Sequence, residues 1–318
     1  MDSPQNTHEF QHTESVCAVI VTHNPDEKVS GLLKTLQNQT TKVIIVDNGS
    51  QGTSKTLFEE LKYSPEVEII ENPDNLGIAV ALNQGLKHAM GQGYEWMVTF
   101  DQDSQPESDL LQKLISAQME IERKNIAIIA PQIIDARLEK PSLFLQRKMP
   151  LIYERVPCNA TSLEDITYVI TSGAMVNTNI AEALGGFRSD LFIDYVDTEF
   201  CLRARKHGYR ILVACEAKIH HYFGERKHIR WGPVDFYPSF HSPERWYTMS
   251  RNRVPMIMTY GLKFPHWLTY EIVATGYILL RMLLTEDRKG AKLNQFLRGT
   301  WDGLRGRMGS PYWAKEEK

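Results

Sequence analysis

The chain has 318 residues, of which 42% are hydrophobic and 24% are charged, ordinary values for a globular protein with a sizeable core. They exclude a disordered, collagen-like or low-complexity chain and allow one or two domains. The net charge of −3 shows no basic excess of the kind that indicates nucleic-acid binding.

The amino-terminal segment shows no export signal. Residues 1–15 lack a basic segment and an apolar segment, so we expect a disordered polar tail. Four cysteines, Cys17, Cys158, Cys201 and Cys215, are widely spaced without a zinc-binding pattern. We therefore expect reduced thiols in a cytoplasmic protein.

Apolar strands alternate with amphipathic helices in the first part of the chain. Helices are expected over residues 29–36, near Ser54–Lys62, and at Ile78–Met90 and Asp109–Arg123. Strands are expected at Val16–Thr22, Lys42–Val46, Val67–Glu71, Trp96–Phe100 and Ile126–Ala130, the last stopped by Pro131. This alternation predicts βαβ units and a largely parallel sheet.

The pattern changes after Pro131. Residues 132–166 predict irregular structure or a small antiparallel element, and a strand at Tyr168–Thr171 is expected to enter the turn Ser172–Ala174. A helix at Val196–His207 and a strand at Arg210–Val213 follow, and from Pro243 to Arg305 the pattern is helical.

Polar residues follow four of the expected strands. Ligands of parallel α/β sheets bind beyond the carboxyl ends of the strands, so one shared site is expected rather than four unrelated turns. The four clusters are Thr22-His23-Asn24, Asp47-Asn48, Asn75-Leu76-Gly77 and Asp101-Gln102-Asp103.

Asp101 and Asp103 are candidate metal ligands. Two carboxylates at this spacing can both reach one octahedral Mg²⁺ or Mn²⁺, whose other ligands would be phosphate oxygens and water. An acidic loop after a strand is also a common solvated turn, so the position after the fourth strand is what favours the metal.

A second acidic cluster consists of Asp194, Asp197 and Glu199 at the start of the helix expected from Val196. Acids in the first turn stabilise a helix, but capping needs only one or two of them. The third is available as a base for a transfer reaction.

Histidines and basic residues follow the strand after this helix. A neutral imidazole of His220 or His221 could complete the coordination of the metal, although a lone histidine is more often structural. The loop Gly224–Arg230, with Arg226, Lys227 and Arg230, suits a diphosphate or is a solvated charged loop.

In this order the motifs resemble the family 2 inverting glycosyltransferases. They are VTHNP, DNGS, NLGIAVALNQG, DQD, SGA and VDTEFCLR, and they run roughly from Val16 to His221. The resemblance implies an α/β domain of the Rossmann-like GT-A fold over residues 16–242, with a mostly parallel central sheet flanked by helices. Residues 243–318 would form a helical carboxyl-terminal extension.

Within the family the chain looks most like the bacterial L-rhamnosyltransferases. The similar segments are DQDS at Asp101–Ser104, LFIDYVDTEFCLRA at Leu191–Ala204, Arg-x-Tyr…Arg-Asn at Arg245–Asn252, and WDGLRGR at Trp301–Arg307. This implies transfer of L-rhamnose from dTDP-L-rhamnose to a hydroxyl of a lipid-linked saccharide or glycolipid. O-antigen-like surface polysaccharide and rhamnolipid synthesis are the implied settings.

The resemblance also assigns the site residue by residue. Asp103 would bind Mg²⁺ or Mn²⁺, with Asp101 beside the ribose and metal and His221 as the downstream metal ligand. Asp197 matches the catalytic base; Val196 replaces the Glu that often precedes it, which leaves Asp194 as a rival base or acceptor-orienting acid. Nucleotide-sugar contacts are implied at Thr22, Asn24, Asp47, Asn48, Asn75, Gly77, Asn83, Asp101, Gln102, Gly173, Arg226 and Arg230, with Asp47 reading the pyrimidine edge.

The carboxyl-terminal helices combine apolar and basic residues. The stretch Trp267–Leu284 is the most membrane-like in the chain, but Glu271 and Arg281 interrupt it. Three roles fit this combination of residues: an interfacial helix on the inner face of the cytoplasmic membrane, a lid, or a homodimer interface. Seven basic residues against three acidic ones lie between positions 281 and 307: Arg281, Arg288, Lys289, Lys292, Arg298, Arg305 and Arg307 against Glu286, Asp287 and Asp302.

Three alternative functions stay open at this point. The same fold could use another nucleotide sugar, such as a UDP-hexose. A sugar-1-phosphate nucleotidyltransferase would need a Gly-rich, basic signature after the first strand, and VTHNPDEK does not resemble one. A non-catalytic glycan- or lipid-binding module would not need Asp103, Asp197 and His221.

Overall fold

The computed structural model describes residues 15–315, apart from residues 41, 53–57, 59–63, 121–124, 223–224, 227–228, 232–233 and 237–238, and the side chains of 223–239 and 315. Most of the expected helix at Ser54–Lys62 and residues 1–14 of the expected tail lie outside this description. Contacts divide the chain into two units. The first comprises the chain up to Gln146, Arg155–Phe192 and Val196–His221, and the second comprises Arg147–Glu154, Ile193–Tyr195 and Tyr222–Lys318.

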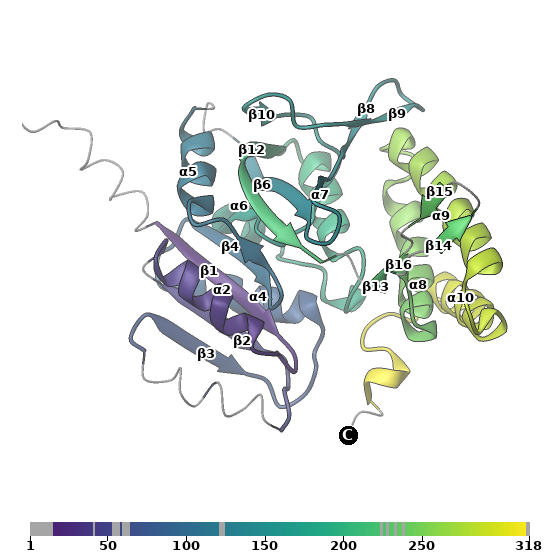
Figure 1. Ribbon diagram of the computed structural model, residues 1–318, viewed down its shortest axis with the longest axis horizontal. Helices are drawn as coiled ribbons and strands as arrows, with labels where there is room; N and C mark the ends of the chain where they lie inside the picture. The colour runs from purple at the N-terminus through teal and green to yellow at the C-terminus, as the bar shows by residue number, and fades with distance from the viewer. Residues whose placement is uncertain are drawn as a thin grey trace, which may run out of the picture. The chain divides into compact units, whose positions relative to one another are not determined.

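The first unit is built on a ten-stranded sheet (Figure 1). Its strands are β1 (Val16–Thr22), β2 (Val43–Asp47), β3 (Val67–Glu71), β4 (Trp96–Asp101), β5 (Gln105–Pro106), β6 (Ile126–Asp135), β7 (Lys140–Pro141), β10 (Ser162–Leu163), β11 (Met175–Asn177) and β12 (Arg210–His221). The main path runs β10-β12-β6-β11-β4-β1-β2-β3, while β5 pairs with β12 and β7 with β6.

The sheet is mostly parallel, as predicted. β1 pairs in parallel with β2 and β4, β2 with β3, and β6 with β12, whereas β11 is antiparallel to both of its neighbours, β4 and β6. Cys17–Ile20 in β1 and Val43–Val46 in β2 are completely buried. Continuous apolar runs of this kind are typical of parallel strands that are covered on both faces.

Helices α2 (Lys28–Gln37), α4 (Ile78–Gly91), α5 (Leu110–Glu120), α6 (Thr178–Ala183) and α7 (Val196–Lys206), with the 3₁₀ turn η1 (Ser189–Leu191), belong to the same unit. α2 buries Val29, Leu32, Leu33 and Leu36, the apolar residues that predicted it. α4 contacts β1, β2 and β4, and α5 contacts β6 and β12. The expected strand–helix alternation is therefore confirmed where the structure describes it.

Three predicted boundaries in this unit are wrong. The strand expected at Arg210–Val213 is β12, which continues to His221, so His220 and His221 lie at the end of the strand and not after it. β6 does not stop at Pro131 but runs through it to Asp135. Its partner β12 has a register irregularity between Ala214 and Lys218, beside this proline. Because the hydrogen-bond ladder between β6 and β12 is already interrupted there, the N–H that Pro131 lacks is tolerated.

The strand expected at Tyr168–Thr171 is the third wrong boundary, because the strand is β11, which begins at Met175. Thr171 instead ends in a tight turn: its carbonyl accepts from the backbone N–H of Ala174 at 2.9 Å and from the hydroxyl of Thr99 at 2.5 Å. With that carbonyl engaged in the turn, ladder pairing with β4 and β6 starts only after it.

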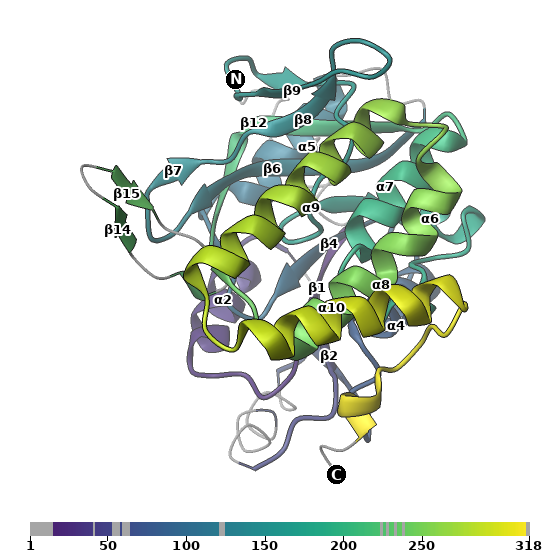
Figure 2. The ribbon, with the colours of Figure 1, turned by 90° about the vertical axis from the view of Figure 1, so that its right-hand side faces the viewer.

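The second unit is mainly helical (Figure 2), as predicted for the chain from Pro243. It contains α8 (Pro243–Tyr260), α9 (Pro265–Thr285), α10 (Lys289–Leu304) and the 3₁₀ turn η2 (Tyr312–Lys315). β13 (Glu225–Arg226) pairs with β16 (Ser239–Phe240), and β14 (Ile229–Trp231) pairs with β15 (Val234–Phe236). β8 (Phe144–Arg147) and β9 (Tyr153–Val156) pair with each other, and residues 147–154 at the end of this ribbon belong to the second unit.

α10 crosses α8 at two glycines of the segment that ends in WDGLRGR. A Cβ on Gly299 would lie 2.2 Å from Ser250 Oγ, and one on Gly303 would lie 2.4 Å from the carbonyl oxygen of Arg251. Because the two glycines are four residues apart, they lie on one face of α10 and allow the two backbones to approach closely. The carboxylate of Asp302, between them, accepts a buried hydrogen bond of 2.9 Å from the hydroxyl of Tyr247 on α8.

The cysteines depart from the expectation of reduced thiols. Cys158 and Cys215 form a disulfide, with Cα atoms 5.4 Å apart, across a sequence separation of 57 residues. The pairing follows from tertiary structure, because β10 lies antiparallel to β12 and places the preceding segment beside Cys215. Cys17 and Cys201 are buried free thiols, and burial raises the pKa of each to about 12.

The disulfide leads to a prediction on stability. Closing a loop of this length restricts the unfolded chain and stabilises a fold by about 2–4 kcal/mol. We expect Cys158→Ser to lower the free energy of unfolding by this amount when no reductant is present, measured by urea denaturation. With reductant, the variant and the wild type should unfold at the same urea concentration. An oxidised wild type no more stable than the variant would contradict the bond.

Candidate functional site

The strand order of the first unit determines where its polar residues meet. β1 has β2 on one side and β4 on the other, so successive strands run outward in both directions from this point. At such a switch point the loops beyond the carboxyl ends of the two central strands separate and leave a crevice for a ligand. Thr22 is in register with Asp47, and Val21 with Asp101, which places the ends of β1, β2 and β4 at one edge of the sheet.

Asp47 organises the loops after β1 and β2. It is 3% exposed, and its Oδ1 accepts hydrogen bonds from the hydroxyls of Thr22, at 3.1 Å, and Ser50. Its Oδ2 accepts from the backbone N–H of Ser50 at 3.0 Å. The hydroxyl of Ser50 in turn accepts from the backbone N–H of Asn24 at 2.7 Å, and Asn24 Oδ1 accepts from the backbone N–H of Gln51. Three of the predicted nucleotide residues therefore form one network.

Asn48 connects this network to the loop after β3. Its Nδ2 donates to Asn75 Oδ1 at 3.0 Å, and its Oδ1 accepts from the backbone N–H of Leu76 at 3.0 Å. Asn75 Oδ1 also accepts from the backbone N–H of Gly77 at 3.0 Å. Gly49 allows this contact, because its φ is +81° and a Cβ there would lie 2.5 Å from the backbone carbon of Asp74.

The loop after β4 is tied to two others. Gln102 Oε1 accepts from the backbone N–H of His23 at 2.8 Å, which links it to the end of β1. Ser104 and Ser172 share a buried hydrogen bond of 2.7 Å, which links it to the turn that contains Gly173. Gly173 has a φ of +76° and donates to the carbonyl of Thr99 on β4 at 2.6 Å.

Asp101, Asp103 and His221 form a candidate metal cluster. A carboxylate oxygen of each aspartate and a ring nitrogen of the histidine all lie within 4.8 Å of one another, and all three residues are half-buried. His221 Nε2 lies 3.9 Å from Asp101 Oδ2. Two carboxylates and an imidazole are a donor set that fits Mg²⁺ or Mn²⁺ with coordination positions left for phosphate and water.

A short strand pairing brings the histidine to the aspartates. β5 follows the DQDS segment directly and is antiparallel to the end of β12, with Gln105 opposite His220. The next residue of β12, His221, therefore reaches the aspartates, 118 residues away from Asp103 in sequence (221 − 103). His220 is not part of the cluster, and its Nδ1 lies 3.9 Å from Glu139 Oε2.

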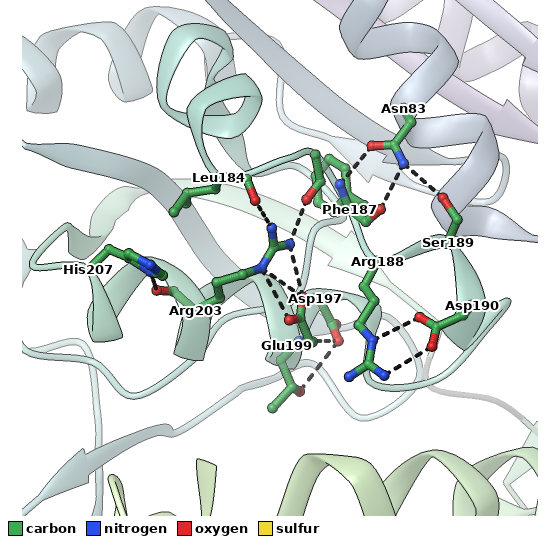
Figure 3. A network of polar contacts seen from close by, with 12 residues as sticks. Asn83, Leu184, Phe187, Arg188, Ser189, Asp190, Asp197, Glu199, Arg203 and His207 are labelled. Carbon is green, nitrogen blue, oxygen red and sulfur yellow. Dashed lines mark hydrogen bonds and ion pairs between the residues drawn. The ribbon is translucent and has the colours of Figure 1, made fainter. Parts of the chain in front are cut away.

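The acids around α7 have different surroundings. Glu199 is 2% exposed, and Arg203 donates to both of its carboxylate oxygens at 3.0–3.3 Å. The same guanidinium donates to the carbonyls of Leu184 and Gly186 (Figure 3). Glu199 thus orients Arg203, and Arg203 anchors α7 to the segment after α6.

Asp197 lies in the first turn of α7 and is half-buried. Its Oδ1 accepts from the backbone N–H of Thr198 at 2.7 Å (Figure 3). Asp194, by contrast, belongs to the second unit, where Arg245 Nε donates to Oδ1 and the hydroxyl of Thr248 donates to Oδ2, each at 2.7 Å.

Of the three remaining predicted nucleotide contacts, only Asn83 has a described side chain, and its hydrogen bonds lie outside the network around Asp47. Asn83 on α4 uses its side-chain amide to hold the segment before η1: Nδ2 donates to the carbonyl of Phe187 at 2.7 Å and to Ser189, while Oδ1 accepts from the backbone N–H of Phe187 (Figure 3). The side chains of Arg226 and Arg230 lie outside the described residues.

No role was assigned to Ser50, Ser104 and Ser172 from the sequence, although the motifs DNGS, DQDS and SGA contain them. Their signal was available: serines in tight turns commonly hydrogen-bond to nearby groups of the loop. Asn252 was noted only as part of a pattern, and its contacts with the backbone of Ile193 and Asp194 could not be read from spacing.

Residues 17–185, more than half of the chain, match the Glycosyl transferase family 2. A dTDP-rhamnosyl transferase of Shigella flexneri, RfbF, is 29% identical over 313 residues, which cover 93% of this chain and 97% of that one. The galactofuranosyltransferase GlfT1 of Mycobacterium tuberculosis is 26% identical over 94% of this chain and 98% of its own.

Solved structures share the fold. A crystal structure of S. aureus TarS 1–349 in complex with UDP-GlcNAc covers 92% of this chain and 81% of its own, with a TM-score of 0.56 at 15% identity. The mannosyltransferase PcManGT of Pyrobaculum calidifontis, in complex with GDP-Man and Mn²⁺, covers 92% and 88% with a TM-score of 0.54 at 15% identity. On the extent of the family match, and with a GT-A-like fold, the chain belongs to Glycosyl transferase family 2 and is a glycosyltransferase.

Proposed function

We propose that this glycosyltransferase moves L-rhamnose from dTDP-L-rhamnose to a hydroxyl of a lipid-linked saccharide or glycolipid, in O-antigen-like polysaccharide or rhamnolipid synthesis. The observation that carries the proposal is the 29% identity to a dTDP-rhamnosyl transferase across 93% of this chain. That similarity extends well beyond residues 17–185 and includes the carboxyl-terminal helices.

Another nucleotide sugar is the second candidate donor. The full-length similarity to a galactofuranosyltransferase, at 26% identity, favours it to a lesser degree. Incubating the purified protein and Mg²⁺ or Mn²⁺ with dTDP-L-rhamnose or UDP-hexoses, and a panel of lipid-linked saccharides and rhamnolipid precursors, tests both. Mass spectrometry should show a product heavier by one deoxyhexose only with dTDP-L-rhamnose. Transfer from a UDP-hexose alone would replace the proposed donor.

The network around Asp47 and Asn48 supports a role in donor binding. It fixes the loops after β1, β2 and β3 before any ligand enters, so little ordering is needed on binding. We assign the nucleoside diphosphate to this edge of the sheet. The other predicted contacts lie at the ends of these strands, in the loops after β1, β3 and β4, or in the turn before β11: Thr22, Asn24, Asn75, Gly77, Gln102 and Gly173.

Asp101, Asp103 and His221 would hold the divalent cation. When bound there, the cation supplies positive charge that offsets the charge developing on the departing diphosphate. The protein contributes a cluster whose three donor atoms are already within 4.8 Å of one another.

Asp197 is the proposed general base. A carboxylate in the first turn of a helix can accept the proton of the acceptor hydroxyl as the oxygen attacks the anomeric carbon. The hydrogen bond from the backbone N–H of Thr198 orients one of the two carboxylate oxygens. A single displacement of this kind inverts the anomeric configuration.

The role of Asp197 can be tested by Asp197→Asn. General base catalysis contributes about 10²–10⁴-fold, so we expect kcat to fall by about 10³-fold, because the amide cannot take the proton. The affinity for dTDP, measured by calorimetry, should stay within about twofold. Asp190→Asn removes a nearby carboxylate paired with Arg188 and serves as the control, with nearly normal kcat. Substantial activity of Asp197→Asn would exclude Asp197 as the base.

The metal site can be tested by Asp103→Asn, which replaces a charged ligand by a neutral amide. We expect the dissociation constant of Mn²⁺, measured by calorimetry with saturating dTDP, to rise at least about tenfold. His220→Ala is the control, because its ring lies next to His221 but outside the cluster. EDTA should abolish transfer by the wild type, and Mg²⁺ or Mn²⁺ should restore it. Equal Mn²⁺ affinities for both variants would contradict the assignment.

We further propose that the second unit lies on an anionic leaflet, on the inner face of the cytoplasmic membrane, where a lipid-linked acceptor is present. α9 is long and apolar enough to cross a membrane by length and composition. The two charges that interrupt it are engaged inside the unit: Glu271 pairs with Arg253 at 2.9 Å, and Arg281 pairs with Glu286 at 3.1 Å. These two charged side chains thus face the interior of the unit, whereas the apolar residues of α9 other than Trp267 and Met282 are at least partly exposed.

The outward residues recur at helical spacing on α9 and α10. Exposed basic residues, including Lys263, Arg288, Lys289 and Arg305, are interspersed with them. An apolar face with neighbouring basic charge suits an interfacial position rather than a water-facing one. The exposed apolar residues are Ile272, Val273, Tyr277, Leu280, Leu283 and Leu284 on α9 and Leu293, Leu297, Trp301 and Leu304 on α10.

The membrane proposal can be tested with the double variant Leu280→Glu/Leu284→Glu. Two buried leucines contribute about 3–6 kcal/mol to insertion, so we expect at least about tenfold weaker sedimentation with vesicles of mixed phosphatidylcholine and phosphatidylglycerol. Binding by the wild type should also weaken as salt rises. Met119→Glu, an exposed position on α5, is the control. If the variant binds vesicles normally but dissociates a dimer in sedimentation velocity, the face is a homodimer interface instead.

A further inference from the structure

The three residues before α7 are held by the second unit, although α7 itself belongs to the first. The chain leaves the first unit at Phe192 and returns at Val196, and Ile193–Tyr195 belong to the second unit. Asp197, the proposed base, comes two residues after this segment. Whatever fixes the backbone of Ile193–Tyr195 therefore also fixes the point from which the first turn of α7 starts.

This segment has an unusual backbone. Asp194 and Tyr195 have φ values of 61° and 64°, and Phe192 just before them has a φ of 66°. Residues with a Cβ rarely adopt this left-handed conformation, and it persists only where surrounding groups hold it. The segment thus needs external contacts to keep its shape.

Asn252 on α8 supplies these contacts. It is completely buried, and its Nδ2 donates to the carbonyls of Ile193, at 2.6 Å, and Asp194, at 3.0 Å. Its Oδ1 accepts from Arg251 Nε at 3.0 Å, and Arg251 Nη1 donates to the carbonyl of Gly309 at 2.8 Å. The Arg-Asn pair is thereby anchored to the chain just after WDGLRGR.

The side chains of the segment are held as well. The Asp194 carboxyl is 9% exposed, and it accepts from Arg245 and Thr248, which lie with Asn252 on one face of α8 at helical spacing. The hydroxyl of Tyr195 donates to Glu271 and accepts from Arg253 Nε at 3.1 Å. Both oxygens of Asp194 are therefore engaged by neighbours on the helix.

We propose that Asn252 and Asp194 are positioning residues for Asp197: they hold Ile193–Tyr195 on α8 and so set where the first turn of α7 begins. This rests on the proposed role of Asp197 as the base. In this proposal Asp194 anchors the segment and does not remove the proton of the acceptor hydroxyl. It also gives the Arg-x-Tyr…Arg-Asn pattern, which lies outside residues 17–185, a role in the transfer reaction.

The first test compares Asn252→Ala, Asn252→Asp and Asp194→Asn with the wild type in rhamnosyl transfer. We expect kcat to fall about 10–100-fold for both Asn252 variants, because alanine and aspartate cannot donate to the two carbonyls, while KM for the donor stays within about twofold. Met258→Ala, an exposed position on the same helix, should retain normal kcat. Normal kcat in both Asn252 variants would overturn the proposal.

The pH dependence of kcat separates positioning from proton removal. Asp194→Asn keeps an oxygen that accepts from Thr248, and we expect about a tenfold loss of kcat with the acid limb of the pH profile retained, because that limb belongs to Asp197. In Asp197→Asn the limb should disappear. Loss of the limb in Asp194→Asn would make Asp194 the base and overturn the proposal.

A readout without substrate keeps the proposal testable if the donor assignment fails. Hydrogen exchange of peptides covering residues 192–201 should be at least about tenfold faster in Asn252→Ala, while peptides of β1 and β4 exchange as in the wild type. Unchanged exchange over 192–201 would overturn the positioning role whatever sugar the enzyme transfers. A general increase in all peptides would show only a destabilised fold, and the Asp194→Asn pH profile then decides.

Discussion

Parallel pairing of β1 with β2 on one side and β4 on the other is the constraint on which the site depends. The strands are completely buried over most of their length, so side chains that contact a charged ligand can lie only beyond their ends. Because parallel strands end at the same edge, Thr22, Asp47 and Asp101 meet there although they are far apart in sequence. The network of Asp47 and Asn48 then fixes the loops, since each buried polar group needs a partner.

The metal cluster depends on a second pairing at the same edge. The two residues of β5 lie against the end of β12, and this brings His221 to Asp101 and Asp103.

The acids near α7 are divided among three tasks by their surroundings. Glu199 is used in an ion pair within the helix, Asp194 is held by α8, and Asp197 stands in the first turn with one oxygen oriented by the backbone.

The second unit explains the apolar stretch that looked membrane-like in the sequence. The charges that interrupt α9, Glu271 and Arg281, are both paired within the unit, while the apolar residues of α9 other than Trp267 and Met282 are at least partly exposed. An arrangement in which apolar residues face outward is costly in water and favourable at a lipid surface. The same helices anchor Ile193–Tyr195, so the contacts of the second unit bear on the acid that follows.

Local pattern by itself determined a large part of this protein. The alternation of apolar strands and amphipathic helices predicted the parallel sheet, and the polar residues after Thr22, Asp47, Asn75 and Asp101 predicted a common site, because periodicity and strand ends are local properties. Tertiary structure alone decided the rest. The passage of β6 through Pro131, the Cys158–Cys215 disulfide, the burial of Glu199 and the hold of Asn252 on Ile193 and Asp194 each depend on a partner distant in sequence. Such partners are chosen by the packing of whole elements, which no local spacing encodes.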